Sequence, residues 1–236
     1  MSVFTRRQFA PAAASLAAVA ASPAFGQTTS ENIKWRLTSS FPKSLDTLYG
    51  ASETIARVVG EMTDGKFVLN PFGAGEIVPA LQVLDAVQNN TVECGHTYTG
   101  YYIGKSPALI FDGSLPFGLT PRMQNAWLMF GGGRKLMDEV YDVFNVVALP
   151  AGNTGGQMFG WFRKELKTVD DFKGLKMRTA GFGGKVLAKL GVVPQQIAAG
   201  DIYPALERGT IDACEWVGPY DDEKLGFSKV ARSEEH

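Results

Sequence analysis

A short segment occurs twice in this sequence, and the repeat constrains the fold more than any other feature. Residues 75–81 read Gly-Glu-Ile-Val-Pro-Ala-Leu, and residues 200–206 read Gly-Asp-Ile-Tyr-Pro-Ala-Leu. Each copy leads into a predicted helix and then into a similar tripeptide, Thr-Val-Glu at 91–93 or Thr-Ile-Asp at 210–212. Two loop–helix–strand units of this kind predict two lobes of like architecture that face each other across a cleft. A chance likeness between two α/β units is the alternative.

The second copy brings side chains suited to ligand binding to the end of a predicted strand. Asp201 is expected to cap the helix, Pro204 to fit its first turn, and Gly209 to end it in a left-handed conformation. The strand that follows ends at Glu215 and Trp216. The carboxyl end of a strand is where an open α/β sheet places its ligand.

Hydrophobic periodicity alternates between strand and helix along the chain. Residues 35–39 alternate as a strand, residues 45–62 carry apolar side chains at helical spacing, and residues 67–69 form a short second strand. Further on, Thr120 is expected to cap another helix. Strands that alternate with helices predict an α/β protein with mixed, mostly parallel sheets flanked by helices.

A near-continuous apolar run and a glycine-rich segment suggest where the lobes divide. Residues 144–149 predict a strand buried on both faces, and residues 150–156 predict the first crossing between lobes. We therefore predict a first lobe over 31–151 and a partial second lobe over 152–218. Residues 219–236 are expected to return towards the first lobe.

The first 26 residues predict a signal peptide rather than part of the fold. Arg6 and Arg7 form a twin-arginine signature, an alanine-rich apolar run follows over 11–21, and a small-x-small cleavage motif precedes Gln27. A chance basic N-terminus is the alternative. No later stretch approaches the roughly 20 apolar residues that a membrane span needs. We expect export by the twin-arginine route and a periplasmic location.

Composition excludes several classes of function. The formal net charge is −1, which gives no electrostatic reason for binding nucleic acid. With His96, His236, Cys94 and Cys214 as its only histidines and cysteines, the chain cannot form a Cys/His zinc centre alone and is poorly equipped for haem or iron–sulfur ligation. We predict no catalytic cofactor and no enzyme activity. Both cysteines are interpreted as small buried strand residues, with a disulfide as the open alternative.

Four residues fall at strand ends or beside the predicted lobe junction, and their chemistry suits an organic anion. Arg178 ends one strand, and its guanidinium fork is shaped to hold a carboxylate. Gln157 and Glu215 offer oxygen ligands for a hard cation. Trp216 offers an apolar wall. A solvated arginine or a structural ion pair is the alternative for Arg178.

At these residues the sequence resembles the solute-binding proteins of tripartite ATP-independent periplasmic (TRAP) transporters. The similarity runs from about 33 to 231 and is most specific over 170–178, 200–209 and 212–220. Residues 191–196, taken with 215–219, look most like the branch that binds 2-oxo acids such as pyruvate.

The resemblance implies a two-lobed periplasmic binding protein of the type II-like class, with the ligand cleft between the lobes. It implies that Arg178 binds the ligand carboxylate and that sodium or calcium bridges ligand and protein. The cation ligands it implies are Gln157 and Glu215 through side chains and Trp216 through its carbonyl. Expected cleft contacts, placed by position alone, are Asn153, Tyr98 and Tyr101. The implied partners are a small organic acid and a TRAP membrane permease, and full-length relatives form homodimers.

Members of this family continue well past the point where this chain stops, at Ser233-Glu234-Glu235-His236. We therefore expect a C-terminally truncated product, incomplete in its second lobe. It would lack the remaining strands, a further cation ligand and the long C-terminal helix that pairs subunits in this branch.

The same residues are consistent with other functions. The ligand of this receptor could be lactate or a dicarboxylate instead of a 2-oxo acid. The chain could also be a ligand-sensing domain that feeds a signalling partner, or an exported enzyme of unknown chemistry. The shortage of histidine and cysteine counts against the enzyme.

Overall fold

The computed structural model describes residues 32–113, 115–231 and 233–235. From Asn32 onward the chain forms one compact unit. The predicted signal peptide, residues 1–26, lies outside the described residues. In the described part of the chain, no helix combines the length and the apolar character needed to cross a membrane.

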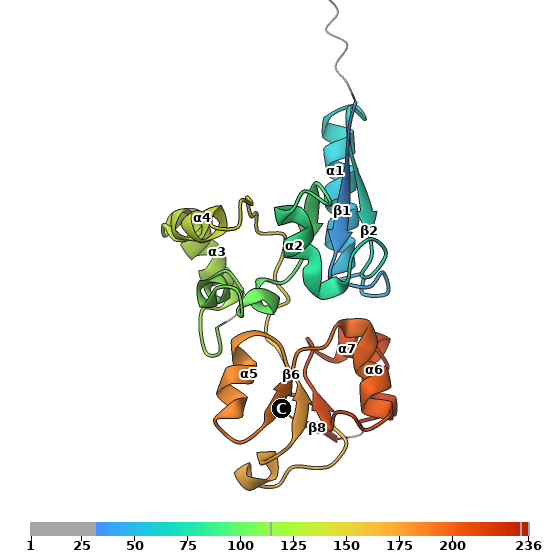
Figure 1. Cartoon of the computed structure of the whole chain (residues 1–236), viewed down its shortest axis with the longest axis vertical. Helices are drawn as coiled ribbons and strands as arrows, with labels where there is room; N and C mark the ends of the chain where they lie inside the picture. The colour runs from blue at the N-terminus through green and yellow to red at the C-terminus, as the bar shows by residue number, and fades with distance from the viewer. Residues whose placement is uncertain (1–31, 114, 232, 236) are drawn as a thin grey trace, which may run out of the picture. The chain divides into compact units, whose positions relative to one another are not determined.

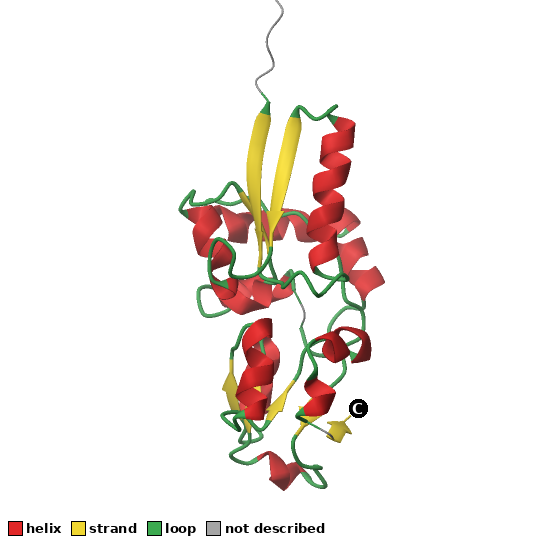
Figure 2. Ribbon diagram, turned by 90° about the vertical axis from the view of Figure 1, so that its right-hand side faces the viewer, coloured by secondary structure: helices red, strands yellow, loops and turns green. Residues whose placement is uncertain are grey.

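The first copy of the repeat belongs to a β-α-β-α-β unit, which we call the first repeat unit (residues 33–96; Figure 1). Its three parallel strands have the order β2-β1-β3. Figure 2 shows α1 running alongside the two long strands β1 and β2. The bounds are β1 Ile33–Ser39, α1 Tyr49–Met62, β2 Phe67–Phe72, α2 Val83–Gln88, preceded by the 3-10 turn Ala80–Gln82, and β3 Cys94–His96.

The second repeat unit (residues 176–214) has the same order of elements, and its parallel strands are arranged β6-β5-β7. Two antiparallel strands extend this sheet to β6-β5-β7-β4-β8. The bounds are β4 Gly160–Phe162, β5 Lys176–Arg178, α5 Gly181–Ala188, β6 Val193–Gln195, α6 Ala199–Glu207, β7 Ala213–Cys214 and β8 Ser233–Glu235.

Strand register shows how closely the two repeat units correspond. Leu37 at the centre of the first sheet lies between Pro71 and Cys94, and Met177 in the second lies between Pro194 and Ala213. Both prolines stand on edge strands, where a missing N–H costs no ladder bond. The predicted α/β class, with mostly parallel sheets flanked by helices, is confirmed.

Helices and short turns connect and follow the repeat units. Thr120 Oγ1 accepts a hydrogen bond from Met123 N, so the predicted helix cap is confirmed. The remaining elements are η2 Thr99–Tyr102, η3 Pro107–Phe111, α3 Pro121–Phe130, α4 Gly133–Asp142, η4 Val169–Phe172, α7 Pro219–Lys224 and η5 Phe227–Lys229.

Three local predictions were wrong. Pro204 lies inside α6 rather than in its first turn. Residues 144–149 form no strand, and Val147 and Leu149 are 83% and 75% exposed, because no described strand lies beside them to complete a ladder. Asp201 does not cap α6, which begins two residues earlier after Ala198; Asp201 lies in the first turn instead, where a carboxylate favours the helix dipole.

Residues 219–235 contact both the first repeat unit, through α7, and the second sheet, through β8. In α7 the Tyr220 hydroxyl donates to Asp46 Oδ2 at 2.9 Å, and Asp46 follows β1. Strand β8, in contrast, pairs with β4 in the second sheet. The open edge of β4 offers β8 its ladder, and the division into lobes stays a prediction.

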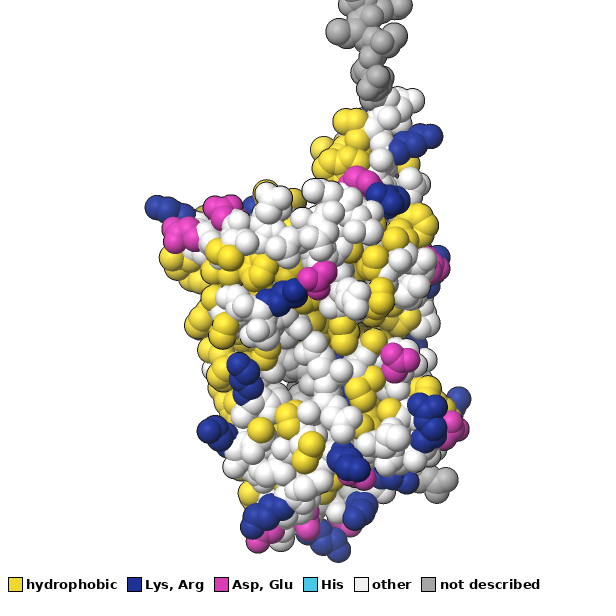
Figure 3. All heavy atoms as spheres, viewed as in Figure 1, with side chains coloured by type: hydrophobic (Ala, Val, Ile, Leu, Met, Phe, Trp, Pro, Cys, Tyr) yellow, Lys and Arg dark blue, Asp and Glu magenta, His cyan; other side chains and the backbone are white. Residues whose placement is uncertain are grey.

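Apolar side chains form one large buried cluster and one smaller cluster behind the second sheet. The large cluster includes Leu45, Ile202 and Phe227, which are completely buried. Other apolar side chains remain on the surface, and Figure 3 shows hydrophobic groups gathered near α3 and α4. Phe130 there is 91% exposed.

Candidate functional site

The candidate site lies where β5 and β7 end side by side. Arg178, the last residue of β5, pairs in register with Cys214, the last residue of β7, so Glu215 follows at the same edge of the sheet. Because β7 ends at Cys214, Glu215 lies beyond the pleated ladder, and its carboxylate contacts Arg178 at this edge. Arg178 is 1% exposed and is the only buried lysine or arginine among the residues that the structure describes.

The Arg178 guanidinium is only partly engaged by the protein. Its Nη1 donates to Glu215 Oε1 at 2.8 Å and to the Glu215 carbonyl at 2.7 Å, and its Nε donates to the Ile197 carbonyl at 3.1 Å. No hydrogen bond joins Nη2 to another described residue. Because a guanidinium carries five N–H donors, one arm of the fork still has two donors for an incoming group.

Glu215 is held from several sides. Its Oε1 also accepts the Ala180 backbone N–H at 2.8 Å, at the start of α5. The Gln157 side-chain amide donates to Glu215 Oε2 and to the Trp216 carbonyl. Burial raises the pKa of the Glu215 carboxyl above its usual value, although the charge of Arg178 opposes that shift.

Gln157, Glu215 and the Trp216 carbonyl therefore meet at one point, from chain positions far apart. Which atom of the Gln157 amide faces the cluster is an assignment, and rotation about its last bond would turn its oxygen inward. Three such oxygens suit a hard cation such as sodium or calcium. In the described part of the chain, no group of three or more His, Cys, Asp or Glu side chains converges as a metal site would require. The donor set fits a hard cation better than a transition metal.

Aromatic side chains surround the pair. The Arg178 Cζ atom lies 4.7 Å from the centre of the Trp216 ring, a cation–π contact. Tyr101 is buried, which raises its pKa to about 12, while the nearby charge of Arg178 acts in the opposite direction. The Tyr98 ring meets that of Tyr101 edge to face at 5.2 Å, and a Cβ atom at Gly181 would come within 2.9 Å of the Tyr98 hydroxyl oxygen.

The structure thus brings together most, but not all, of the residues predicted from the sequence. Glu215 and Trp216 each contact both Arg178 and Gln157, and Tyr101 lies near Arg178; the roles of these residues in binding stay predictions. Asn153 is not part of this cluster. It is exposed, and its Oδ1 accepts the Gly155 backbone N–H at 2.8 Å in a local turn.

Sequence reasoning missed two backbone partners. The Ala180 N–H holds Glu215, and the Ile197 carbonyl holds Arg178 Nε. The available signal for the first was a small residue and a glycine, Ala180 and Gly181, at a helix start shortly after a strand, because such a start leaves backbone N–H groups free. No sequence signal pointed to Ile197.

Neither cysteine takes part in a disulfide. Cys214 is fully buried, as predicted, and burial raises the pKa of its thiol. Cys94 is only half-buried, which differs from the prediction, because β3 is an edge strand of its sheet.

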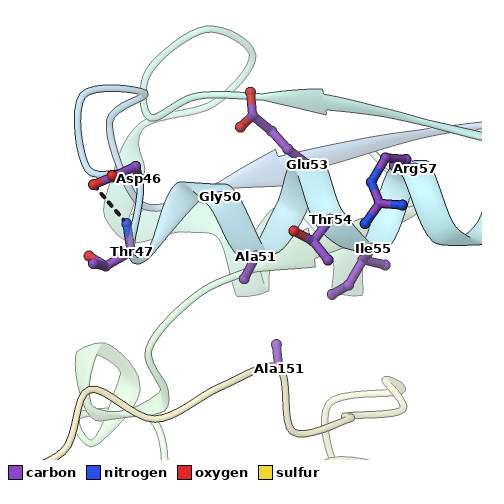
Figure 4. A pocket seen from close by; sticks show the side chains of 9 residues that line it. All are labelled: Asp46, Thr47, Gly50, Ala51, Glu53, Thr54, Ile55, Arg57 and Ala151. Carbon is purple, nitrogen blue, oxygen red and sulfur yellow. Dashed lines mark hydrogen bonds between the residues drawn. The ribbon is translucent and has the colours of Figure 1, made fainter.

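A separate hollow of about 600 Å³ lies beside the first turns of α1 (Figure 4). Asp46, Glu53, Arg57 and Ala151 are among its lining residues, together with apolar groups of the helix face. None of the predicted site residues lines it. Its charged side chains point away from one another rather than towards a common centre, as the close view shows.

The family of this chain follows from comparison with known proteins. The model of the bacterial extracellular solute-binding protein family 7 matches residues 38–233. The chain belongs to this family, which is one of solute-binding receptors rather than enzymes. The resemblance to TRAP solute-binding proteins that the sequence shows is confirmed.

Individual relatives are more specific. The chain is 61% identical over 201 residues to a monocarboxylate 2-oxoacid-binding periplasmic protein of Nostoc sp. strain PCC 7120, covering 85% of this chain and 55% of that protein. A TRAP transporter solute-binding protein from Bordetella bronchiseptica RB50, a dimer with copurified calcium and picolinate in one of its sites, is 57% identical with a TM-score of 0.84. One from Pseudoalteromonas atlantica T6c, with bound sodium and pyruvate, is 44% identical with a TM-score of 0.82.

The match does not extend over the whole length of these relatives. It covers 85% of this chain in both structural comparisons, but 60% of the Bordetella chain and 61% of the Pseudoalteromonas chain. The chain spans little more than half the length of the Nostoc relative.

Proposed function

We propose that this protein is the extracytoplasmic receptor of a TRAP transporter and captures a small 2-oxo acid such as pyruvate together with a cation. The observation that carries the proposal is the buried Arg178, whose Nη2 has no hydrogen-bond partner among the described residues, beside the converging Gln157 amide, Glu215 carboxylate and Trp216 carbonyl. The relatives named for 2-oxo acids or holding pyruvate support the same ligand class.

Charge balance explains why ligand and cation would bind together. Arg178 is already paired with Glu215 at 2.8 Å, so this buried pair is neutral overall. A carboxylate entering alone would add an uncompensated negative charge to a buried site, which is costly. A cation held by Gln157, Glu215 and the Trp216 carbonyl would offset it. When bound, that cation would supply electrostatic attraction for the ligand oxygens.

The same balance favours a monocarboxylate over a dicarboxylate. A second carboxylate would need a second positive partner in the site. Arg178 is the single buried cationic side chain in the described residues and is paired with Glu215, so one added monovalent cation matches one ligand carboxylate. Lactate meets this requirement as well as pyruvate does.

The rest of the receptor model follows the family. Division into lobes at 31–151 and 152–218 would let the protein close on its ligand, and ligand binding would shift the population towards the closed state. The twin-arginine segment would direct export to the periplasm, where the receptor would deliver its ligand to the membrane permease. Pairing of two copies is part of this proposal, since the Bordetella relative was crystallised as a dimer.

The first test measures pyruvate binding by calorimetry and thermal shift in sodium, calcium or choline chloride. Pyruvate should raise the melting temperature in sodium or calcium, should bind much more weakly in choline, and should be recovered unchanged. Arg178→Ala should weaken binding by about 100-fold or more, because it removes one partner of a buried charge pair. Arg178→Lys keeps a positive charge beside Glu215, so it serves as a second variant in case Arg178→Ala does not fold.

The matched control is Arg163→Ala, since Arg163 is an exposed arginine 4.0 Å from Asp212 and outside the site. It should leave pyruvate affinity unchanged. Equal affinity in wild type and both Arg178 variants would remove Arg178 from the ligand site. Conversion of pyruvate into another compound would overturn the receptor assignment.

A further inference from the structure

Two buried tryptophans in the same apolar cluster differ in one respect. Trp161 and Trp216 are 8% and 6% exposed. The Trp161 Nε1–H donates to Asp222 Oδ2 at 2.8 Å. The Trp216 Nε1 atom is buried and has no hydrogen-bond partner among the described residues. One indole donor is satisfied within the protein, and the other is not.

An unpaired buried N–H is rare, because it loses its hydrogen bond to water without gaining another. A phenylalanine would provide the same apolar ring without that loss. The position of the orphan donor is informative. Trp216 directly follows Glu215, and the Arg178 Cζ atom lies 4.7 Å from the centre of its ring. The two stacked side chains therefore hold donors with no partner among the described residues, Nε1 of Trp216 and Nη2 of Arg178.

We propose that the Trp216 Nε1–H donates a hydrogen bond to an oxygen of the bound acid, so that Trp216 helps to determine which ligand is accepted. This inference rests on the proposed function of the site. It gives Trp216 a third role beside the apolar wall of its ring and the cation ligand of its carbonyl.

The donor would discriminate by the chemistry of the ligand. A carboxylate, keto or hydroxyl oxygen can accept from an indole N–H, whereas an ammonium group has no lone pair and cannot. In a site built around buried donors, a ligand that leaves one of them unpaired is rejected strongly. Pyruvate and lactate should therefore bind, and alanine should not.

The test compares Trp216→Phe with Trp161→Phe, a matched pair that removes one indole N–H each. Trp216→Phe should weaken pyruvate binding by about tenfold and leave the melting temperature of the ligand-free protein unchanged or higher. Trp161→Phe should lower the melting temperature of the ligand-free protein, because it leaves the buried Asp222 Oδ2 without its donor. Its affinity for pyruvate should stay at the wild-type value.

A spectroscopic readout follows the donor directly. The chain has four tryptophans, so four indole N–H signals are expected in a nitrogen-15 correlation spectrum. Pyruvate should move the signal that Trp216→Phe deletes, and the signal that Trp161→Phe deletes should stay in place.

The outcomes separate this inference from the proposal beneath it. If wild type binds pyruvate and Arg178→Ala does not, but Trp216→Phe binds like wild type, the inference is overturned and the receptor stands. A fall in ligand-free melting temperature with unchanged affinity in Trp216→Phe would likewise assign the indole a purely structural role. If wild type shows no Arg178-dependent binding, both proposals fail.

Discussion

The two repeat units are alike at the start of their third strands. In the first, the Glu93 carboxylate accepts the Arg36 backbone N–H at 2.7 Å. In the second, the Asp212 carboxylate accepts the Lys176 backbone N–H at 3.0 Å. Each acid lies just before a strand and engages the central strand beside it. The tripeptide that marks the repeat in the sequence thus has the same structural task in both copies.

At the other end of the same strands the two units differ. Arg178 pairs in register with Cys214, and Thr38 pairs with Gly95. The residue that follows is Glu215 in the second unit and His96 in the first. His96 Nδ1 is bonded to Ser52 Oγ at 2.9 Å, and burial lowers the pKa of His96 to about 4, so the ring is neutral.

The difference shows which part of a repeated scaffold is free to vary. The strand start is tied to the neighbouring strand by a backbone hydrogen bond, so its acid belongs to the fold in both units. The strand end carries a neutral hydroxyl–imidazole pair in one unit and a charged pair in the other, so its side chains differ between the units. This is the edge at which open α/β sheets bind ligands.

The largest effect on stability is expected at Gly95, the register equivalent of Cys214. A Cβ atom there would lie 2.4 Å from Val83 Cγ1 and 3.2 Å from Val87 Cγ2 of α2. Valine is stiff about its first torsion and cannot swing away. Gly95→Ala should therefore lower the free energy of unfolding by about 2 kcal/mol, as measured by urea denaturation.

Gly50 in α1 provides the control, because a Cβ atom at that position meets nothing within 4 Å. Gly50→Ala should be neutral or stabilise the protein by up to about 1 kcal/mol. If Gly95→Ala were equally harmless, the close approach of α2 would not distinguish the first unit from the second.

Much of the scaffold could be predicted from the sequence because its signals are local. Pro79-Ala80-Leu81 begins helical structure in the first unit, Gly209 follows α6 in a left-handed conformation, and Thr120 caps α3 as expected. Segment 144–149 was misjudged for the opposite reason. Its apolar residues suit a strand, but a strand exists only with a partner, and the local pattern does not name one.

The same distinction applies to the candidate site. Glu215 and Trp216 were placed at a strand end by local pattern, and Arg178 at another. That the two ends meet is a matter of register between β5 and β7. The contact between Gln157 and Glu215 joins residues far apart in sequence, and position alone also suggested Asn153, which lies elsewhere.

A smaller effect on the free energy of unfolding is expected from the titration of His96, at the strand end of the first unit. The unfolded chain protonates His96 near its ordinary pKa of about 6.5, whereas the folded protein holds it neutral down to about 4. Stability that depends on neutral His96 is thus present above about pH 6.5 and is lost as the pH falls towards 4. Near pH 5 the loss should be about 1–2 kcal/mol.

His96→Gln removes this titration and can keep a hydrogen bond to Ser52. Urea denaturation near pH 7 and pH 5 should show a steeper loss in wild type than in the variant. The carboxylates common to both proteins cancel in this difference. Parallel losses in the two proteins would mean that the imidazole is solvated when folded, and that the first strand end is less closed than its contacts indicate.

The smallest effect is expected where the repeat units agree. Glu93→Gln and Asp212→Asn each weaken one carboxylate–backbone hydrogen bond, and each should cost about 0.5–1 kcal/mol.

Arg36 also donates to the Glu93 side chain and holds the pKa of that carboxyl down, to about 2. This ion pair is solvent-exposed and adds little. High salt should therefore reduce the Glu93 loss slightly and bring the two values together. Neither variant should alter pyruvate affinity. A clear loss in one unit and none in the other would show that matching geometry at the strand starts does not carry matching energy.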